Sequence, residues 1–279
     1  MKPAPFDYDL ARDLDHAVST FAAVEGEAKY ICGGQTLGPM MSLRLTQPDH
    51  LIDIARLEAL RACTEGETQV VLGAALRHAE IEDGTFPDPS GGLMPRAARS
   101  LAYRAVRNRG TLGGSVSYAD PAAEWPNILS ALDATVLVYG ANGARKLPLS
   151  EFLVGYLTTA LSPEEIVIGF QVPILGPGAR TGYFKLCRQP GEYAESLAIT
   201  VLSGSGTARC LLGCAAPVPL ILRATSEIAA GLSHWHPDAV PDIAAAVMQD
   251  FNDAGVEADD LDRRKHASIV ARSIRDALT

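Results

Sequence analysis

The chain lacks the sequence features of several common protein classes. Its 279 residues contain no run of 18 or more apolar residues, so we expect no membrane-spanning helix. The formal net charge is −9 and no cluster of Lys and Arg could follow a nucleic-acid backbone, which argues against a nucleic-acid partner. Residues 1–5 (Met-Lys-Pro-Ala-Pro) do not resemble a signal peptide, so we expect a cytoplasmic protein. With 47% hydrophobic and 20% charged residues, the composition is that of a globular protein with room for two domains.

Cysteine is scarce and odd in number. The five cysteines show neither the spacing of a disulfide framework nor that of a ferredoxin, so we expect no iron–sulfur cluster in this chain. Cys210 and Cys214 lie four residues apart and are followed by His234 and His236, a set that could hold zinc. Small buried thiols beside unrelated histidines explain the same residues, and we favour that interpretation.

Sequence signatures of nucleotide binding and hydrolysis are also absent. No G-x-G-x-x-G opens a βαβ unit, and no G-x-x-x-x-G-K-[ST] occurs, so neither a Rossmann site nor a P-loop is supported. The chain has no G-x-S-x-G elbow and no H-E-x-x-H pair, and its polar residues form no recognisable triad. Any redox chemistry must therefore come from a bound cofactor.

Two glycine loops are the strongest positive signal. Residues 33–36 (Gly-Gly-Gln-Thr) follow a short apolar segment, and residues 111–115 (Thr-Leu-Gly-Gly-Ser) form the second loop. Paired glycines let backbone N–H groups approach an anion because no Cβ holds the ligand away. Thr36, Thr111 and Ser115 add hydroxyl groups. The first loop alone would more often be a plain turn, but the two together predict a clamp around a pyrophosphate.

The hydrophobic periodicity predicts an α+β protein. Apolar segments bounded by turn residues predict strands at 28–32, 50–54, 69–72, 135–139, 165–172, 182–186, 196–202 and 208–214. Helical spacing predicts helices at 39–45, 74–82, 91–106, 121–132, 223–232, 237–251 and 261–278. Pro39 and Pro121 suit first helical positions, and Asp120 can cap the helix that Pro121 begins. Two prolines and two glycines in 173–178 predict a boundary near 174–180.

The residues around both loops resemble a known family. Residues 32–37 with Pro-Met-Met at 39–41 are similar to the first FAD loop of the medium, flavin-binding subunits of molybdenum hydroxylases. That family includes bacterial carbon monoxide dehydrogenase and the xanthine dehydrogenase type. Residues 107–115 and 119–124 (Ala-Asp-Pro-Ala-Ala-Glu) resemble its second loop, and the likeness continues nearly end to end.

The resemblance implies a fold. It implies an FAD-binding domain of the PCMH (vanillyl-alcohol-oxidase-like) type at 1–176, made of two α/β subdomains that meet near 55–60. A C-terminal α+β domain at 177–279, with a small antiparallel sheet and helices, would follow it.

The resemblance also implies cofactor-binding residues, and no catalytic or metal-binding ones. The first loop would wrap the FAD pyrophosphate and part of the isoalloxazine edge, and the second would hold the pyrophosphate from the other side. Glu124 would bind a ribose or ribityl hydroxyl, Tyr193 would lie near the isoalloxazine ring, and Leu101, Val167 and Lys185 would approach the flavin or adenine. The full set is Tyr30, Ile31, Cys32, Gly33, Gly34, Gln35, Thr36, Leu37, Leu101, Thr111, Gly113, Gly114, Ser115, Asp120, Glu124, Val167, Lys185 and Tyr193.

Pattern alone gives some of these residues plainer interpretations. Glu124 could lie on the exposed face of its helix, Lys185 could be a solvated edge residue, and Tyr193 could be a packing residue. Arg107 and Arg109 could be a solvated charge run, could brace the loop, or could bias the flavin electrostatically. The sequence leaves these alternatives open.

In the family, electrons leave a molybdenum cofactor on a large subunit, pass two [2Fe–2S] clusters on a small subunit and reach the FAD of the medium subunit. We therefore expect an electron-transferring oxidoreductase subunit that passes electrons to an external acceptor, within a dimer of heterotrimers. A stand-alone FAD-dependent oxidoreductase of the same fold is the alternative, although neither loop has the histidine that often links flavin covalently. A scaffold without flavin would need loops that had lost their glycines or hydroxyls. Ile269, Val270, Ile274 and Ala277 share one face of the last helix, which fits packing against a partner or against the chain's own core.

Overall fold

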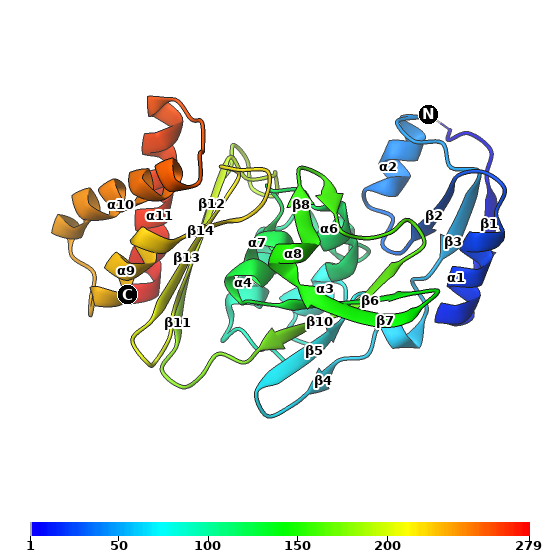
Figure 1. Cartoon of the computed structure of the whole chain (residues 1–279), viewed down its shortest axis with the longest axis horizontal. Coiled ribbons are helices and arrows are strands. Elements are labelled where there is room, and N and C mark those ends of the chain that lie inside the picture. Colours follow the sequence, from blue (N-terminus) through cyan, green and yellow to red (C-terminus); the bar gives the residue numbers. More distant parts are fainter. Residues whose placement is uncertain (1) are drawn as a thin grey trace.

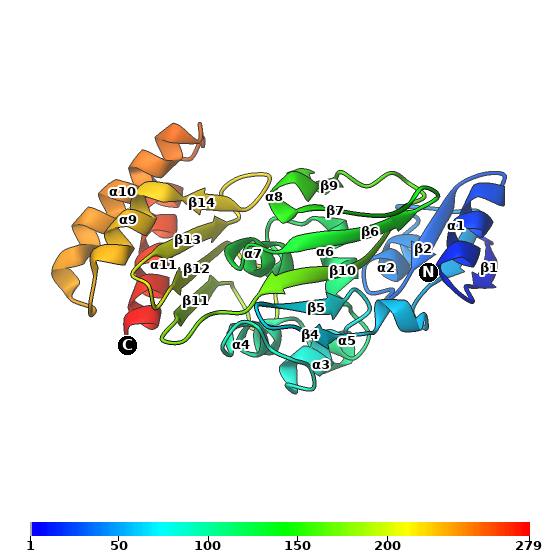
Figure 2. The same cartoon turned by 60° about the horizontal axis from the view of Figure 1, so that its bottom comes forward.

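The computed structural model describes residues 2–279. The molecule is elongated, with the N-terminus at one end and the C-terminal helices at the other, and three successive sheets lie between them (Figures 1 and 2). The mixture of helices and strands confirms the predicted α+β class. No helix within this described range is long and apolar enough to cross a membrane.

The N-terminal part is a parallel sheet of three strands in the order β1-β3-β2. Asp13 begins its first helix, because the carboxylate accepts a hydrogen bond from the backbone N–H of His16 at 2.7 Å. Ala17 and Ile52 are fully buried in the core between this helix and the sheet. The elements are β1 (Asp7–Leu10), α1 (Leu14–Ala23), β2 (Ala28–Ile31), α2 (Leu37–Ser42), β3 (His50–Asp53) and the 3-10 turn η1 (Glu58–Leu60).

The central part is an antiparallel sheet in the order β4-β5-β10-β6-β7, covered by short helices. Trp125, Phe152 and Phe170 are its largest buried side chains. The elements are β4 (Thr64–Glu65), β5 (Gln69–Gly73), α3 (His78–Glu82), α4 (Leu93–Ser100), α5 (Arg104–Arg107), α6 (Leu112–Tyr118), α7 (Glu124–Ala131), β6 (Thr135–Gly140), β7 (Gly143–Pro148), α8 (Leu149–Phe152), the hairpin β8 (Leu153–Gly155) and β9 (Thr158–Thr159), and β10 (Ile166–Pro173).

The C-terminal part is an antiparallel sheet, β11-β12-β13-β14, with helices on one face and the central part on the other (Figure 2). Strand β12 is buried along its whole length, since Ile199 joins the central core and Ala198 joins the core under the last helix. That helix approaches the sheet so closely that a Cβ at Gly182 would lie 1.8 Å from the Ser273 carbonyl oxygen. The elements are β11 (Arg180–Leu186), β12 (Ser196–Leu202), β13 (Ala208–Gly213), β14 (Leu220–Leu222), α9 (Arg223–Gly231), η2 (Pro237–Ala239), α10 (Val240–Asp253) and α11 (Asp260–Leu278).

The apolar face of α11 is therefore used within the chain. Ile269, Val270, Ile274 and Ala277 are all buried in the core between α11 and the C-terminal sheet. Of the two interpretations of this face, packing against the chain's own core is the one observed.

Four predicted helix boundaries are wrong. The helix expected at 91–106 is two helices, because the chain turns at 101–103, where Ala102 has a φ of +36°. The helix expected at 74–82 begins only at His78, because the backbone groups of residues 74–76 form hydrogen bonds with other segments of the chain. Asp120 caps a turn by accepting a bond from Ala122 N at 2.8 Å, and α7 begins at Glu124. In α2, Pro39 occupies the third position and not the first.

The conceivable zinc set does not assemble. Cys210 is buried, and burial raises the pKa of its thiol to about 12, which disfavours the thiolate that a metal needs. The Cys214 thiol donates to the Ala194 carbonyl at 3.3 Å. Within residues 2–279, no group of three or more His, Cys, Asp or Glu side chains could hold a metal ion. The plainer interpretation, buried thiols beside unrelated histidines, is the better one.

Candidate cofactor-binding site

A cleft of about 780 Å³ brings the two glycine loops together. All the sequence-predicted site residues line this cleft except Asp120. Strands β2, β10 and β11 and helices α2, α6 and α7 each contribute to its wall, so the site draws on all three parts of the chain. Segments far apart in the sequence thus meet around one space, whose volume is that of a typical ligand-binding site.

The first loop leaves its backbone donors free. Among the hydrogen bonds of the described residues, none uses the N–H groups of residues 33–36 as donors. Gly34 has a φ of +67°, a conformation that glycine adopts without strain. The Thr36 hydroxyl makes no capping bond to α2, although Thr36 is the N-cap residue. Free amides and a free hydroxyl make this loop a suitable cradle for a pyrophosphate.

The two loops touch through backbone atoms. A Cβ built on Gly33 would lie 2.5 Å from the Arg109 carbonyl oxygen and 3.0 Å from the Gly110 Cα. Only glycine permits this approach, because any side chain would push the loops apart. The contact fixes how far apart the two loops lie in the wall of the cleft.

The second loop offers only one bare amide within the described chain, that of Thr111, so the expectation that both loops present free backbone donors is wrong for most of this one. Its other N–H groups bond within the protein: Leu112 N to Leu76 O at 2.9 Å and Gly113 N to Ala74 O at 2.8 Å. Gly114 N donates to the Thr111 hydroxyl at 3.2 Å. Gly113 is required for packing, since a Cβ there would lie 2.6 Å from the Ala74 Cβ. This loop is a rigid wall that contributes side-chain hydroxyls.

Glu124 and Lys185 form a buried ion pair in the wall of the cleft. Lys185 Nζ lies 2.6 Å from Glu124 Oε1 and 3.3 Å from the Ser100 carbonyl oxygen. The two side chains are 2% and 6% exposed, for Glu124 and Lys185 respectively. Burial raises the pKa of Glu124, and the Lys185 ammonium opposes that shift. The interpretations of Glu124 as an exposed-face residue and Lys185 as a solvated residue are therefore wrong.

Tyr193 lies at the rim of the cleft. It is 58% exposed, so the interpretation of it as a packing residue is wrong. Leu101 forms a parallel bridge with Gly191, and both line the same wall. Asp120 lies outside the lining residues, because its carboxylate is used in the turn before α7.

His78 is a cleft residue that sequence reasoning missed. The Trp125 indole donates its N–H to His78 Nδ1 at 3.0 Å, so in neutral His78 the proton resides on Nε2. Burial lowers the pKa of His78 to about 3, which keeps the ring neutral at physiological pH. No local signal could have found it, because its position depends on Trp125, 47 residues away.

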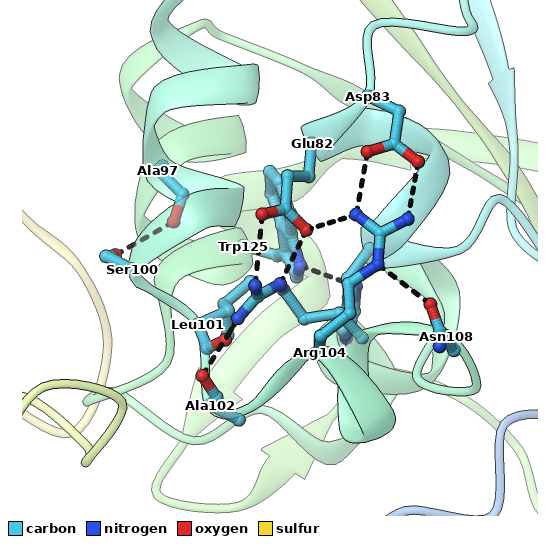
Figure 3. A network of polar contacts seen from close by, with 11 residues as sticks. Glu82, Asp83, Ala97, Ser100, Leu101, Ala102, Arg104, Asn108 and Trp125 are labelled. Atoms are coloured by element: carbon cyan, nitrogen blue, oxygen red, sulfur yellow. Dashed lines mark hydrogen bonds and ion pairs between the residues drawn. The ribbon is translucent and has the colours of Figure 1, made fainter.

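The structure also decides the role of Arg107. Its guanidinium is 11% exposed and bonds to Glu82 and to the carbonyl groups of Leu101 and Ala102, so it braces the chain beside the cleft (Figure 3). Arg109 is exposed. Of the three interpretations, bracing fits Arg107.

These observations fit the cofactor that the resemblance implies. The first loop suits a pyrophosphate, because it has four free amides, a free hydroxyl and a glycine whose Cβ would meet the facing loop. The cleft is also lined by apolar side chains such as Ile31, Leu101 and Val167, which suit aromatic ring systems. Neither loop carries a histidine that could link flavin covalently.

Comparison with known proteins agrees with this geometry. Residues 4–175 match the family described as "FAD binding domain in molybdopterin dehydrogenase". The chain is 35% identical over 210 residues to the 6-hydroxypseudooxynicotine dehydrogenase complex subunit alpha of Paenarthrobacter nicotinovorans, covering 75% of this chain and 71% of that one. It is 34% identical over 206 residues to the carbon monoxide dehydrogenase medium chain of Hydrogenophaga pseudoflava, covering 74% and 72%.

Solved structures give the same result over nearly the whole chain. A chain of carbon monoxide dehydrogenase from Hydrogenophaga pseudoflava superimposes with a TM-score of 0.89 at 31% identity, covering 99% of this chain and 98% of that one. A chain of quinoline 2-oxidoreductase from Pseudomonas putida 86 gives 0.87 at 27% identity, with coverage of 99% and 98%. The glycine loop suits a pyrophosphate, and the relatives are subunits of dehydrogenases. The chain therefore belongs to the family of FAD-binding domains of molybdopterin dehydrogenases, as a medium, flavin-binding subunit.

Proposed function

We propose that the cleft holds one FAD and that the chain receives electrons from [2Fe–2S] clusters of a partner subunit and passes them to an external acceptor. The observation that supports this most is the meeting of the two glycine loops at Gly33 and Arg109, with free amides on the first loop. When bound, FAD supplies a ring system that takes up electrons singly and releases one or two of them.

Each part of the cleft has a distinct task in this proposal. The amides of residues 33–36 and the Thr36 hydroxyl bind the pyrophosphate, and Ser115 adds a hydroxyl from the opposite wall. Glu124 accepts a bond from a ribose or ribityl hydroxyl while Lys185 balances its charge. Tyr193, exposed in the cleft wall, would lie near the isoalloxazine ring, which would supply the redox chemistry. The remaining predicted lining residues, Tyr30, Ile31, Cys32, Leu37, Leu101, Thr111, Gly113, Gly114 and Val167, shape the walls, as do the side chains of the first loop.

The proposed partners follow from the names of the relatives. Proteins described as medium chains of carbon monoxide and glyceraldehyde dehydrogenases support a complex with a large and a small subunit. In that complex the large subunit would carry the molybdenum cofactor and the small one two [2Fe–2S] clusters. We propose a dimer of such heterotrimers in the cytoplasm.

The proposed domain division places an FAD-binding domain at 1–176 and a second domain at 177–279. The end of the family match at residue 175 and the absence of any helix or strand between β10 and β11 within the described chain support it. Within the first domain, the change from the parallel to the antiparallel sheet supports two subdomains that meet near 55–60.

An absorbance spectrum of the purified chain tests the proposal. Flavin bands at about one FAD per chain, released into the supernatant on acid precipitation, are expected, together with no oxidation of an organic substrate by the isolated chain. Added FAD at about 100 times its Kd should stabilise the protein by roughly 2.7 kcal/mol. A colourless chain that gains no stability from FAD would refute the cofactor assignment, and turnover of an organic substrate by the isolated chain would favour a stand-alone enzyme.

A further inference from the structure

Arg107 connects a carboxylate on one side with a turn of the cleft wall on the other. Its Nε and Nη2 donate to the two carboxylate oxygens of Glu82 at 2.7 and 3.0 Å. Its Nη1 donates to the carbonyl oxygens of Leu101 at 2.6 Å and Ala102 at 2.9 Å. These bonds converge between the labelled residues Glu82, Leu101 and Ala102 in Figure 3. Because the guanidinium is largely buried, water competes little for them.

The turn that Arg107 holds has an unfavourable backbone conformation. Ala102 has a φ of +36°, in the left-handed region that residues with a Cβ avoid. Two adjacent peptide groups direct their carbonyl oxygens to the same guanidinium. Arg107 therefore compensates for the strain at Ala102, and without it the chain at 101–103 would relax.

The same turn supports the segment that carries Tyr193. Leu101 is bridged to Gly191, and a Cβ at Gly191 would lie only 3.1 Å from the Ala102 carbonyl oxygen. Leu101, Ala102, Gly191 and Tyr193 all line the cleft. A shift of the turn would thus move one complete wall of the site.

We propose that Arg107 is a positioning residue for the flavin: it fixes the turn at 101–102, and through it residues 191–193, against the isoalloxazine ring. The inference depends on the proposed function, since it requires FAD in this cleft. Glu82 orients the guanidinium through bonds to both of its carboxylate oxygens at 2.7 and 3.0 Å, whereas the more exposed Arg104 bonds chiefly to Asp83 and Asn108 and shares one Glu82 oxygen. A lysine could not replace Arg107, because a single nitrogen cannot reach Glu82 and both carbonyl groups at once.

The test compares Arg107→Lys with Arg104→Lys in the full chain. Arg104 makes the matched control, because it lies three residues earlier on α5 and also pairs with Glu82, but its side chain donates to Glu82, Asp83 and Asn108 and to no atom of residues 101–102. For each protein, FAD is titrated into the apoprotein, and the visible absorption and circular dichroism of the bound flavin are recorded at saturation. We expect Arg107→Lys to weaken FAD binding by about tenfold and to shift the flavin bands at saturation. Arg104→Lys should match the unmutated chain in both.

The outcomes separate this inference from the proposed function. An unmutated chain that binds no FAD refutes the proposed function. If the unmutated chain binds FAD and Arg107→Lys has the same affinity and the same flavin spectrum, the role of Arg107 is refuted and the cofactor assignment stands. If far-UV circular dichroism shows that Arg107→Lys does not fold, Glu82→Gln takes its place. Removal of the charge that orients Arg107 must then shift the flavin bands, and an unchanged spectrum overturns the inference.

Discussion

Lys185 and Glu124 meet 2.6 Å apart in a wall of the cleft, although 61 residues separate them in the chain. Glu124 is the first residue of α7, and Lys185 lies on β11, so the pair connects the central helices to the C-terminal sheet. Both side chains are almost completely buried. A buried charge that has lost its partner is costly, which makes this pair sensitive to any one-sided change.

Lys185→Met should destabilise the apoprotein by about 3–5 kcal/mol, because it leaves Glu124 buried without its counter-charge. The Lys185 ammonium is the main group that stabilises the charged form of Glu124 against the effect of burial. Without it, the pKa of Glu124 rises further above its ordinary value of 4.5. Folding then favours the protonated form, and the loss of stability should grow as the pH rises above that value. Urea unfolding at several pH values measures both effects. The double variant Lys185→Met/Glu124→Gln serves as control and should recover part of the loss; a double variant as unstable as Lys185→Met alone would contradict this account.

His78 should make the protein sensitive to acid. Its pKa is about 3 in the folded chain against an ordinary value of 6.5, so the unfolded chain binds more protons between these values. Stability is therefore complete above about pH 6.5 and is lost as the pH falls toward 3, at no more than about 1.4 kcal/mol per pH unit. His78→Gln should flatten the dependence of unfolding free energy on pH between 7 and 4. His266 lies outside the cleft, and burial lowers its pKa to about 4. The variant His266→Gln therefore reports how much a second buried histidine contributes to the dependence of unfolding free energy on pH. Equal slopes for His78→Gln and the unmutated chain would contradict the prediction.

The sequence predicted what depends on local chemistry. Strands β2, β5 and β6 and the helix α11 follow from apolar patterns that are complete within each segment, and the glycine loops follow from their own residues. It gave no sign of β1, whose four residues are all exposed, or of β7, a polar edge strand. The alternation of β1 (Asp-Tyr-Asp-Leu) is only four residues long, and the residues of β7 do not alternate.

What the sequence could not predict depends on distant partners. The helical pattern at 91–106 continues without a break, but α4 ends at Ser100, and the distant Arg107 side chain binds the Leu101 and Ala102 carbonyl groups of the turn that follows. The amides of Leu112 and Gly113 in the second loop donate to Leu76 and Ala74, which no motif within the loop could reveal. Pairing of Glu124 with Lys185 likewise requires the third sheet to fold against the second.

Thr36→Val should weaken FAD binding with little effect on the apoprotein. The Thr36 hydroxyl makes no capping bond, so its replacement by a methyl group of similar volume removes only a group that is free to bind the ligand. Loss of one hydrogen bond to a charged pyrophosphate oxygen corresponds to about 1.5–3 kcal/mol, or a Kd raised by roughly tenfold or more. Flavin titration of the apoprotein measures the Kd. Thr36→Ser keeps the hydroxyl and should bind nearly as tightly as the unmutated chain, whereas an equal loss in both variants would point to shape and not to the hydroxyl.

Gly33→Ala should separate the two loops. The added Cβ would lie 2.5 Å from the Arg109 carbonyl oxygen, and both sides of the contact are backbone, so neither can rotate away. We expect the free energy of unfolding to fall by about 1–3 kcal/mol and FAD affinity to fall at least about tenfold. Gly38→Ala is the matched control five residues later, where a Cβ would meet no atom within 4 Å and the helical position favours alanine. Urea unfolding of the apoproteins and flavin titration distinguish the two variants. If Gly33→Ala binds FAD as tightly as Gly38→Ala, the backbone contact does not set how far apart the loops lie, and the loops adapt to the cofactor independently.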